Sequence, residues 1–391
     1  RWRISYANHP FSKFVFNLEI CMTSGLQMSR RIRRTPFTTR VEQNNVRGFT
    51  VVNHMLLPKA FEPSVEDDYW HLKKHAQIWD VSTQRQVELK GPDAAKLVQM
   101  MTPRNLSKAR VGQCLYVPLV DETGGMINDP VLLKLGNDHF WLSIADSDVL
   151  LWAKGLATGA KFDVKIIEPD VYPLAIQGPK AEDLIAKLFG EEVRAIKFFN
   201  FGWIDFEGTK QLIARSGFSK QGGFEIYLNG SNLGGRLWDA VWDAGQEFNI
   251  RAGCPNLIER IEGGLLSYGN EFTRENNPLE CGLVQYCSLD APVDYLAKDA
   301  LLKIHKRGID RVMRGILFDG PACPPCGEPW PVFANHTQIG QITSAIWSPN
   351  LNQNIGLSMI EKAFWTEGQK LQICMPECQI KNGTVALLPF V

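Results

Sequence analysis

The chain has 391 residues, with 42 basic and 42 acidic side chains and therefore a formal net charge of zero. This balance excludes proteins that bind nucleic acids or anionic membranes through a large surplus of positive charge. Hydrophobic residues make up 45% and charged residues 21%, values typical of a globular protein. The length is sufficient for two or three domains.

The cysteines and the apolar segments indicate a cytoplasmic protein. No run approaches the roughly 20 apolar residues needed to span a bilayer. Most of the nine cysteines lie in apolar or strand-like runs, so we expect free thiols in a reducing compartment. Residues 1–28 are expected to be an unfolded extension, either upstream read-through before a start at Met28 or Met22, or a segment for organelle targeting.

Strand-like and helix-like patterns alternate through most of the chain. In chain order they predict a strand at 49–58, a helix at 64–80, a strand at 81–91, a helix at 92–102, a hairpin at 114–135, a strand at 138–145 and a helix at 147–157. The alternation continues to about residue 310, so we expect an α+β domain at 29–310, made of two similar halves.

The pattern changes after residue 310. From Met313 onward, short apolar runs are separated by Gly, Pro and Asn, and no helical periodicity remains. Several short strands with turn signals predict a small all-β barrel or sandwich at residues 311–391.

Two groups of residues have the spacing of metal ligands. His71 and His75 are four residues apart on the predicted helix, but a third ligand is not evident and a solvent-exposed helix face is the favoured interpretation. Cysteines at 323, 326, 374 and 378 have the residue types of a zinc site, although the first pair lies in a proline-rich loop.

One carboxylate lies in a hairpin with a fixed backbone. Residues 121–125 form a glycine-rich turn, and Asp129 follows it directly before Pro130. A residue that precedes proline is held in an extended conformation. Asp129 is therefore either a capping residue of the turn or a positioned functional carboxylate.

A second candidate is a glycine-rich loop that leads into a strand. In residues 217–227, Glu225 and Tyr227 share one face of the strand, while Phe224 and Ile226 point to the other face and into the core. An acid and an aromatic ring on one exposed face suit a flat heterocycle with hydrogen-bond donors, whose face Phe218 of the loop could cover. The alternative is an ordinary half-exposed strand.

These segments together resemble the folate-binding aminomethyltransferase family, which includes the T-protein of the glycine cleavage system. The resemblance extends from about residue 29 to 391 and is strong because many weak motifs occur in one order. The motifs are IWDVS (78–82), GGMIND (124–129), AIQGP (175–179), KFF (197–199), SGFSKQGGFEI (216–226), ERIEGGLLSYGNE (259–271) and IGQITSAIWSPNLNQNIGLSMI (339–360).

The resemblance implies a fold and a folate site. It implies an α+β folate-binding T-protein-like fold with a C-terminal barrel, tetrahydrofolate as an acceptor, and no metal. Asp129 and Glu225 match the two acids of the family's folate site, and Tyr116 precedes Asp129 by 13 positions, as in the family. The implied residues are Asp129 for catalysis and Tyr116, Lys197, Phe198, Phe199, Asn200, Glu225 and Asn256 for the folate.

Other segments resemble a branch of the family that demethylates a sulfonium compound, dimethylsulfoniopropionate. They include DVSTQRQVE (80–88), EPDVYPLAIQGPK (168–180) and GCPNLIERIE (253–262). Asn256 stands where T-proteins have an arginine, and Phe218–Gln221 replaces an acidic loop. The implied reaction is methyl transfer to tetrahydrofolate, which yields 3-methylthiopropionate and 5-methyltetrahydrofolate. The alternatives are another folate-dependent aminomethyltransferase or demethylase and a non-catalytic folate-binding protein.

A sulfonium donor suggests which side chains bind it. Aromatic faces attract a cation that donates no ordinary hydrogen bond, and Phe218, Tyr227 and Tyr172 are the candidates. Asn53, His54 or an arginine is expected to bind the donor's carboxylate. The partners are thus small molecules, with no nucleic acid or membrane, and the protein is expected to be a monomer or a homodimer.

Overall fold

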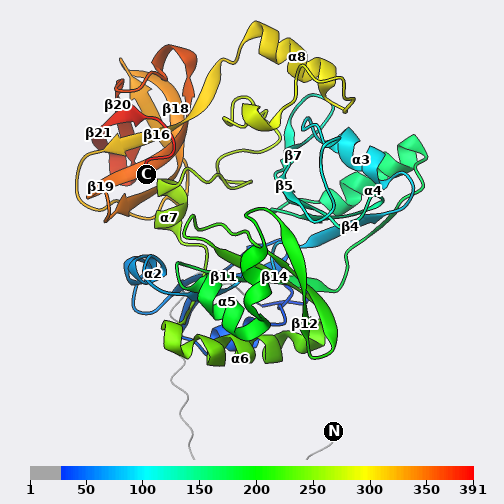
Figure 1. The fold of residues 1–391 in the computed structure, drawn as a ribbon. Helices are drawn as coiled ribbons and strands as arrows, with labels where there is room; N and C mark the ends of the chain where they lie inside the picture. The colour runs from blue at the N-terminus through cyan, green and yellow to red at the C-terminus, as the bar shows by residue number, and fades with distance from the viewer. Residues whose placement is uncertain (1–27) are drawn as a thin grey trace, which may run out of the picture.

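The computed structural model describes residues 28–391, so all but the last residue of the predicted extension at 1–28 lies outside the described residues (Figure 1). Two α+β bodies and a barrel lie around a common centre (Figure 1). None of the helices in residues 28–391 is long and apolar enough to cross a membrane. The expected α+β fold is confirmed; the division into domains at residue 310 stays a prediction.

The first body is an antiparallel sheet with the strand order β10-β4-β9-β8-β5. Its strands are β4 (Gln86–Lys90), β5 (Cys114–Tyr116), β8 (Val131–Lys134), β9 (His139–Ser143) and β10 (Lys165–Ile167). Two helices, α3 (Ala94–Met101) and α4 (Val149–Ala160), pack against it and share its buried apolar cluster. The helices bury their apolar stripe against the sheet, as amphipathic surface helices do.

The second body is a sheet with the order β12-β13-β14-β11-β3-β15, in which only β15 and β3 pair in parallel. Its strands are β3 (Gln77–Asp80), β11 (Val171–Gln177), β12 (Phe201–Phe206), β13 (Thr209–Ala214), β14 (Gly223–Asn229) and β15 (Arg251–Gly253). Helices α5 (Ala181–Phe189) and α6 (Gly234–Gly245) pack on one face. The other face meets the first sheet, where Leu212 and Tyr227 contact the cluster around Cys114 and Trp141.

The C-terminal region forms a closed barrel in the order β16-β19-β18-β17-β20-β21, which confirms the predicted barrel. Its strands are β16 (Arg311–Phe318), β17 (Trp330–Ala334), β18 (Thr337–Ser348), β19 (Gln353–Glu361), β20 (Lys370–Met375) and β21 (Gln379–Ala386). Closure pairs every strand on both sides and leaves no exposed sheet edge.

Shorter elements connect these three bodies. They are α1 (Thr38–Glu42), the hairpin of β1 (Val46–Val52) and β2 (Met55–Phe61), α2 (Val65–Leu72), the hairpin of β6 (Leu119–Val120) and β7 (Met126–Asn128), α7 (Leu257–Glu262) and α8 (Lys298–Arg307). Short 3₁₀ helices cover Glu191–Ala195, Ser231–Leu233, Gln246–Phe248, Val284–Tyr286, Lys362–Phe364 and Pro376–Cys378.

Two predicted elements differ from the structure. The helix expected at 64–80 ends at Leu72, and Gln77–Asp80 form the buried strand β3, because pairing with β11 and β15 overrides the helical pattern. The strand expected at 49–58 is a hairpin whose turn residues Asn53 and His54 have φ values of 50° and 63°. Asparagine tolerates positive φ and is favoured in such turns.

Candidate active site

A cavity of about 1720 Å³ lies where the two sheets, α7 and the barrel meet. Its wall includes Asp129 from the first body, the loop at 215–220 from the second, and Arg314 and Thr343 from the barrel. The segments 263–270 and 281–286 complete the wall. This volume exceeds the roughly 300–1,000 Å³ of common ligand pockets, so it has room for two substrates at once.

Asp129 lies between β7 and β8 and lines this cavity. The Tyr116 hydroxyl donates a hydrogen bond of 2.9 Å to its Oδ2. Part of the residue is exposed, yet Oδ1 is buried and has no hydrogen-bond partner within residues 28–391. Burial raises the pKa of Asp129 to about 7, and the bond from Tyr116 opposes that rise. The carboxyl can thus change protonation state near neutral pH.

The backbone around Asp129 is held by its neighbour Asn128. The Asn128 side chain donates to Ser147 Oγ at 2.8 Å and accepts from the backbone N–H of Ala145 at 2.9 Å and of Asp129 at 3.0 Å. Asn128 is fully buried, so its amide groups need these partners. The hairpin is therefore fastened to the loop after β9, and Asp129 is a positioned carboxylate rather than a turn cap.

Glu225 lies behind the cavity wall, on β14. Its carboxylate accepts a hydrogen bond from the hydroxyl of Ser216, which lines the cavity, and burial raises the pKa of Glu225. The expectation that Glu225 and Tyr227 point to an exposed face is wrong, because they are 5% and 0% exposed. The first sheet covers that face of β14, and the ring centroids of Trp141 and Tyr227 lie 6.3 Å apart. Phe224 and Ile226 point into the core, as predicted.

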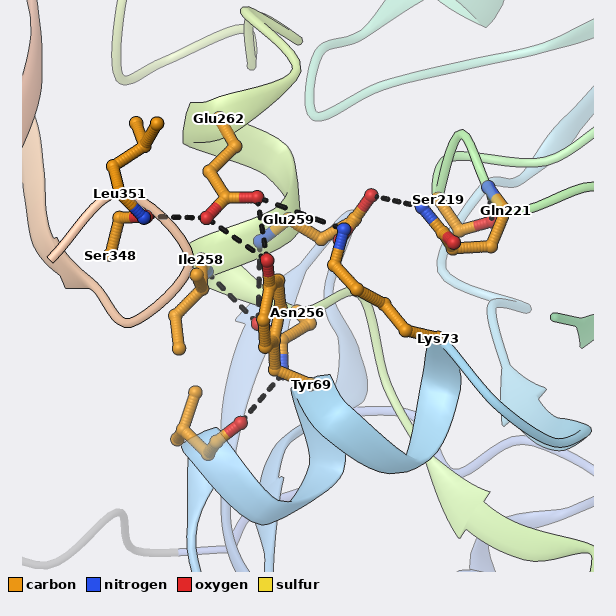
Figure 2. A network of polar contacts seen from close by, with 11 residues as sticks. Tyr69, Lys73, Ser219, Gln221, Asn256, Ile258, Glu259, Glu262, Ser348 and Leu351 are labelled. Carbon is orange, nitrogen blue, oxygen red and sulfur yellow. Dashed lines mark hydrogen bonds and ion pairs between the residues drawn. The ribbon is translucent and has the colours of Figure 1, made fainter. Parts of the chain in front are cut away.

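A polar network connects the glycine-rich loop to α7 (Figure 2). The Gln221 amide donates to Glu259 at 2.7 Å, and the Lys73 ammonium lies 3.4 Å from Glu259 and 3.9 Å from Glu262. Tyr69 donates to Glu262 at 2.8 Å.

The same network reaches the barrel. Ser348, at the end of β18, donates to Glu262 at 2.5 Å, so the barrel and the loop are attached to one helix. Asn256 caps that helix, since its Oδ1 accepts from the backbone N–H of Ile258 at 2.9 Å (Figure 2). The α7 helix thus connects the loop and the barrel through hydrogen bonds to Glu259 and Glu262.

Comparison with known proteins identifies the family. Residues 37–291 match the model of the GCVT N-terminal domain, and residues 311–391 match the glycine cleavage T-protein C-terminal barrel domain. The chain belongs to the glycine cleavage T-protein family. The family that the sequence motifs indicated is thereby confirmed.

Individual relatives and a solved structure agree with this family. The chain is 50% identical to a protein of Ruegeria pomeroyi named dimethylsulfoniopropionate demethylase, over 89% of this chain and 95% of that protein. It is 30% identical to an aminomethyltransferase of Caldanaerobacter subterraneus, over 83% of this chain and 87% of that protein. The crystal structure of aminomethyltransferase T from Bartonella henselae has the same fold, with a TM-score of 0.83, 22% identity, and coverage of 92% of this chain and 98% of that one.

The structure brings some of the predicted folate-binding and donor-binding residues to the cavity. Besides Asp129, the lining residues among them are Tyr116, Phe198, Phe199, Phe218 and Asn256. Lys197 is exposed and Asn200 donates to the carbonyl of Phe198 at 3.1 Å, and neither lines the cavity.

The remaining predicted donor-binding residues lie elsewhere. Tyr172 shares a face of β11 with Leu174 and Ile176, and side chains on that face pack toward α5 and α6. Asn53 donates both its side-chain hydrogen bonds to backbone carbonyls, at 2.8 and 2.9 Å, and His54 occupies the exposed turn. Tyr227 is enclosed between the two sheets. We therefore withdraw these four residues from the donor site.

Sequence reasoning missed another part of the cavity wall. Tyr286 packs against Tyr116 with ring centroids 4.8 Å apart, and Tyr268 also lines the cavity. Arg104 lies over the Tyr286 ring, 5.3 Å from its centroid. Tyr268 lies within the motif at 259–271, but nothing in that motif assigns it to the cavity. No motif marks Arg104 and Tyr286, because they lie in short connecting segments that only the fold brings to Asp129.

The two groups with metal-ligand spacing have other surroundings. His71 Nε2 donates to the carbonyl of Asn249 at 2.8 Å, and burial lowers the pKa of His71 to about 4. Cys323 and Cys326 line the cavity. Among the residues that the structure describes, which exclude the side chain of Cys378, no cluster of three or more potential metal ligands occurs.

Proposed function

We propose that this T-protein relative transfers a methyl group from dimethylsulfoniopropionate to tetrahydrofolate. The products are 3-methylthiopropionate and 5-methyltetrahydrofolate. The observation that carries the proposal is the 50% identity, over 89% of the chain, to a protein named dimethylsulfoniopropionate demethylase. The identity to the aminomethyltransferase of Caldanaerobacter is 30%. The cavity supports the proposal because it can hold two small substrates next to a buried carboxylate.

The reaction requires little from the protein beyond alignment of the methyl donor with the reduced pterin. A sulfonium methyl is already activated, since its leaving group is a neutral thioether. A nitrogen of the reduced pterin attacks the methyl carbon in line with the bond to sulfur, and that bond's electron pair goes to sulfur. Holding two reactants in such an arrangement is worth roughly 7–11 kcal/mol. The meeting of three bodies around one cavity supplies rigid walls for this alignment.

Asp129 stabilises the positive charge that the attacking pterin nitrogen gains in the reaction. The attacking nitrogen becomes cationic and must lose a proton to give the neutral product. A carboxylate with a pKa near 7 can stabilise the cation and accept that proton, directly or through water. Tyr116 holds the carboxylate through a hydrogen bond to Oδ2, and Oδ1 has no hydrogen-bond partner within residues 28–391.

The folate has suitable surroundings on the same wall. Phe198, Phe199 and Phe218 all line the cavity, and such rings can cover the faces of a pterin. Glu225 and Ser216 lie at the base of the loop, where their hydrogen-bonded pair can accept the donor groups of the pterin edge. Asn256 contributes by fixing the start of α7.

Incubation with both substrates tests the proposal. Purified protein, tetrahydrofolate and dimethylsulfoniopropionate should yield 3-methylthiopropionate, and omission of the folate should stop its formation. Turnover with methylamine donors in place of the sulfonium would indicate another folate-dependent transferase. Folate binding without turnover of either donor class would indicate a non-catalytic folate-binding protein.

A further inference from the structure

Arg104 belongs to the same cluster as the proposed catalytic carboxylate. It follows α3, and its guanidinium donates to the backbone carbonyl of Tyr116 at 2.5 Å. The guanidinium also lies over the ring of Tyr286, which packs against Tyr116. Tyr116 in turn donates to Asp129. One side of the cavity therefore presents a cation, two aromatic rings and an acid in direct succession.

The charge of Arg104 has no acidic partner. Within residues 28–391, no carboxylate lies within 4.0 Å of its nitrogens, whereas Arg215 and Arg260 on the same cavity wall pair with Glu182 and Glu271. Burial lowers the pKa of Arg104, but a guanidinium remains charged in proteins. Its backbone is fixed, since its N–H donates to Thr102 Oγ1 at 3.2 Å and its carbonyl accepts from Gln99 at 3.0 Å.

Another cavity arginine without an acidic partner, Arg314, has different surroundings. It lies on β16 of the barrel, 5.9 Å from the centroid of the Trp365 ring, and donates to the carbonyls of Trp365 and Met313 at 3.0 and 3.2 Å. None of these contacts involves Tyr116, Tyr286 or Asp129. Of the four arginines that line the cavity within residues 28–391, Arg104 is the one that contacts both Tyr116 and Tyr286.

We propose that Arg104 binds the carboxylate of the methyl donor and so positions its sulfonium against the rings of Tyr116 and Tyr286, beside Asp129. This inference rests on the proposed function and names a residue that selects the donor. In dimethylsulfoniopropionate two methylene groups separate the cationic sulfur from the carboxylate. The zwitterion thus matches a wall that places a guanidinium and a carboxylate on either side of two aromatic rings.

Selectivity follows from the same contacts. A guanidinium can bind a carboxylate through two parallel hydrogen bonds, which fix the direction of the bound molecule as well as its position. A bound sulfonium without a carboxylate would shield those guanidinium donors from water without pairing them, and sites of this kind discriminate strongly against such analogues. The methyl group would also be free to point away from the pterin.

A comparison of two methyl donors distinguishes this role from a general effect on folding. Dimethylsulfoniopropionate and dimethylpropylsulfonium are compared by kcat/KM at saturating tetrahydrofolate, in the wild type and in Arg104→Met, Arg104→Lys and Arg110→Met. The ratio between donors does not depend on the fraction of protein that is folded. Arg110 is the control, because it is an exposed arginine of the same loop and does not line the cavity.

The wild type should prefer the carboxylate donor by roughly 100-fold or more. Arg104→Met should reduce this preference to within about fivefold, Arg104→Lys should retain part of it because a point charge lacks the paired geometry, and Arg110→Met should keep it. If the wild type is active and Arg104→Met keeps the same preference, the proposed role of Arg104 is overturned, while the proposed function stands. Absence of methyl transfer by the wild type from either donor overturns the proposed function and this inference with it.

Discussion

The Tyr116 hydroxyl donates a 2.9 Å hydrogen bond to Oδ2 of Asp129, whose Oδ1 is buried and has no partner within residues 28–391. A buried acceptor without a partner is costly, and such groups are frequent at functional sites. The pair comes from two strands, β5 and the end of β7, that the first sheet and its adjoining hairpin bring together.

Asp129→Asn should lower the rate of methyl transfer by roughly 10²–10⁴-fold, the usual contribution of an acid–base group. Asparagine keeps the shape and the contact with Tyr116 but carries no charge. Single-turnover kinetics with both substrates saturating measure the effect. A variant within about threefold of the wild type would leave Asp129 with a structural role, and alignment alone would then account for the reaction.

The activity should depend on pH through Asp129. With a pKa of about 7, half of the carboxyl groups are ionised at pH 7, so kcat/KM should rise with pH, reach half its maximum at about pH 7 and level off about one unit above that. A bound sulfonium favours the carboxylate, so the corresponding rise in kcat should occur at lower pH. Tyr116→Phe removes a bond that lowers the pKa and should move the rise in kcat/KM upward. Asp129→Asn should lack the rise; the same rise in that variant would assign it to another group.

The same pKa predicts how stability depends on pH. The folded-state pKa of Asp129 is raised from 3.8 to about 7, so its contribution to folding is fully present below about pH 4 and is lost as pH rises toward 7. Asp129→Asn should therefore become more stable relative to the wild type as pH increases over this range. Urea unfolding at pH 5 and pH 8 measures the difference, and an equal difference at both values would contradict the raised pKa.

Glu225→Gln should weaken tetrahydrofolate binding by roughly 1.5–3 kcal/mol, the range for hydrogen bonds to a charged group. Glu225 is buried behind Ser216, and glutamine keeps its size while removing the charge. Calorimetric titration with tetrahydrofolate measures the affinity. An unchanged affinity would remove Glu225 from the folate site and leave it as a partner of Ser216.

Lys73→Met should destabilise the protein by about 2–3 kcal/mol, because it leaves the buried carboxylates of Glu259 and Glu262 without their cation. Lys187→Met is the matched control, since Lys187 and Glu247 are about half exposed and such pairs contribute less than about 1 kcal/mol. Urea unfolding of both variants gives the comparison. Equal effects would show that the network around α7 adds no more than a surface ion pair.

Local patterns in the sequence predicted the C-terminal barrel, the fixed hairpin before Asp129 and the loop at 217–223. These features depend on turn residues and strand periodicity, which neighbouring residues determine. The match of Asp129 and Tyr116 to a folate site came from family resemblance. In the structure the two side chains, 13 positions apart in the sequence, are joined by a hydrogen bond.

Long-range packing decided the features that the sequence did not reveal. Tyr227 is enclosed because the sheet of the first body covers β14, and alternation along one strand gives no sign of that covering sheet. Gln77–Asp80 became a strand through pairing with β11 and β15. Arg104 and Tyr286 are separated by 182 positions in the sequence, so only the folded chain shows that they meet.

Tracing the methyl group tests the central claim most directly. Dimethylsulfoniopropionate with deuterated methyl groups is incubated with tetrahydrofolate and the wild-type protein, and both products are analysed by mass spectrometry. One labelled methyl group should appear in 5-methyltetrahydrofolate in an amount equal to the 3-methylthiopropionate formed, which should retain the other. Methylthiopropionate formed without labelled methyltetrahydrofolate, or no conversion at all, would contradict methyl transfer to folate by this protein.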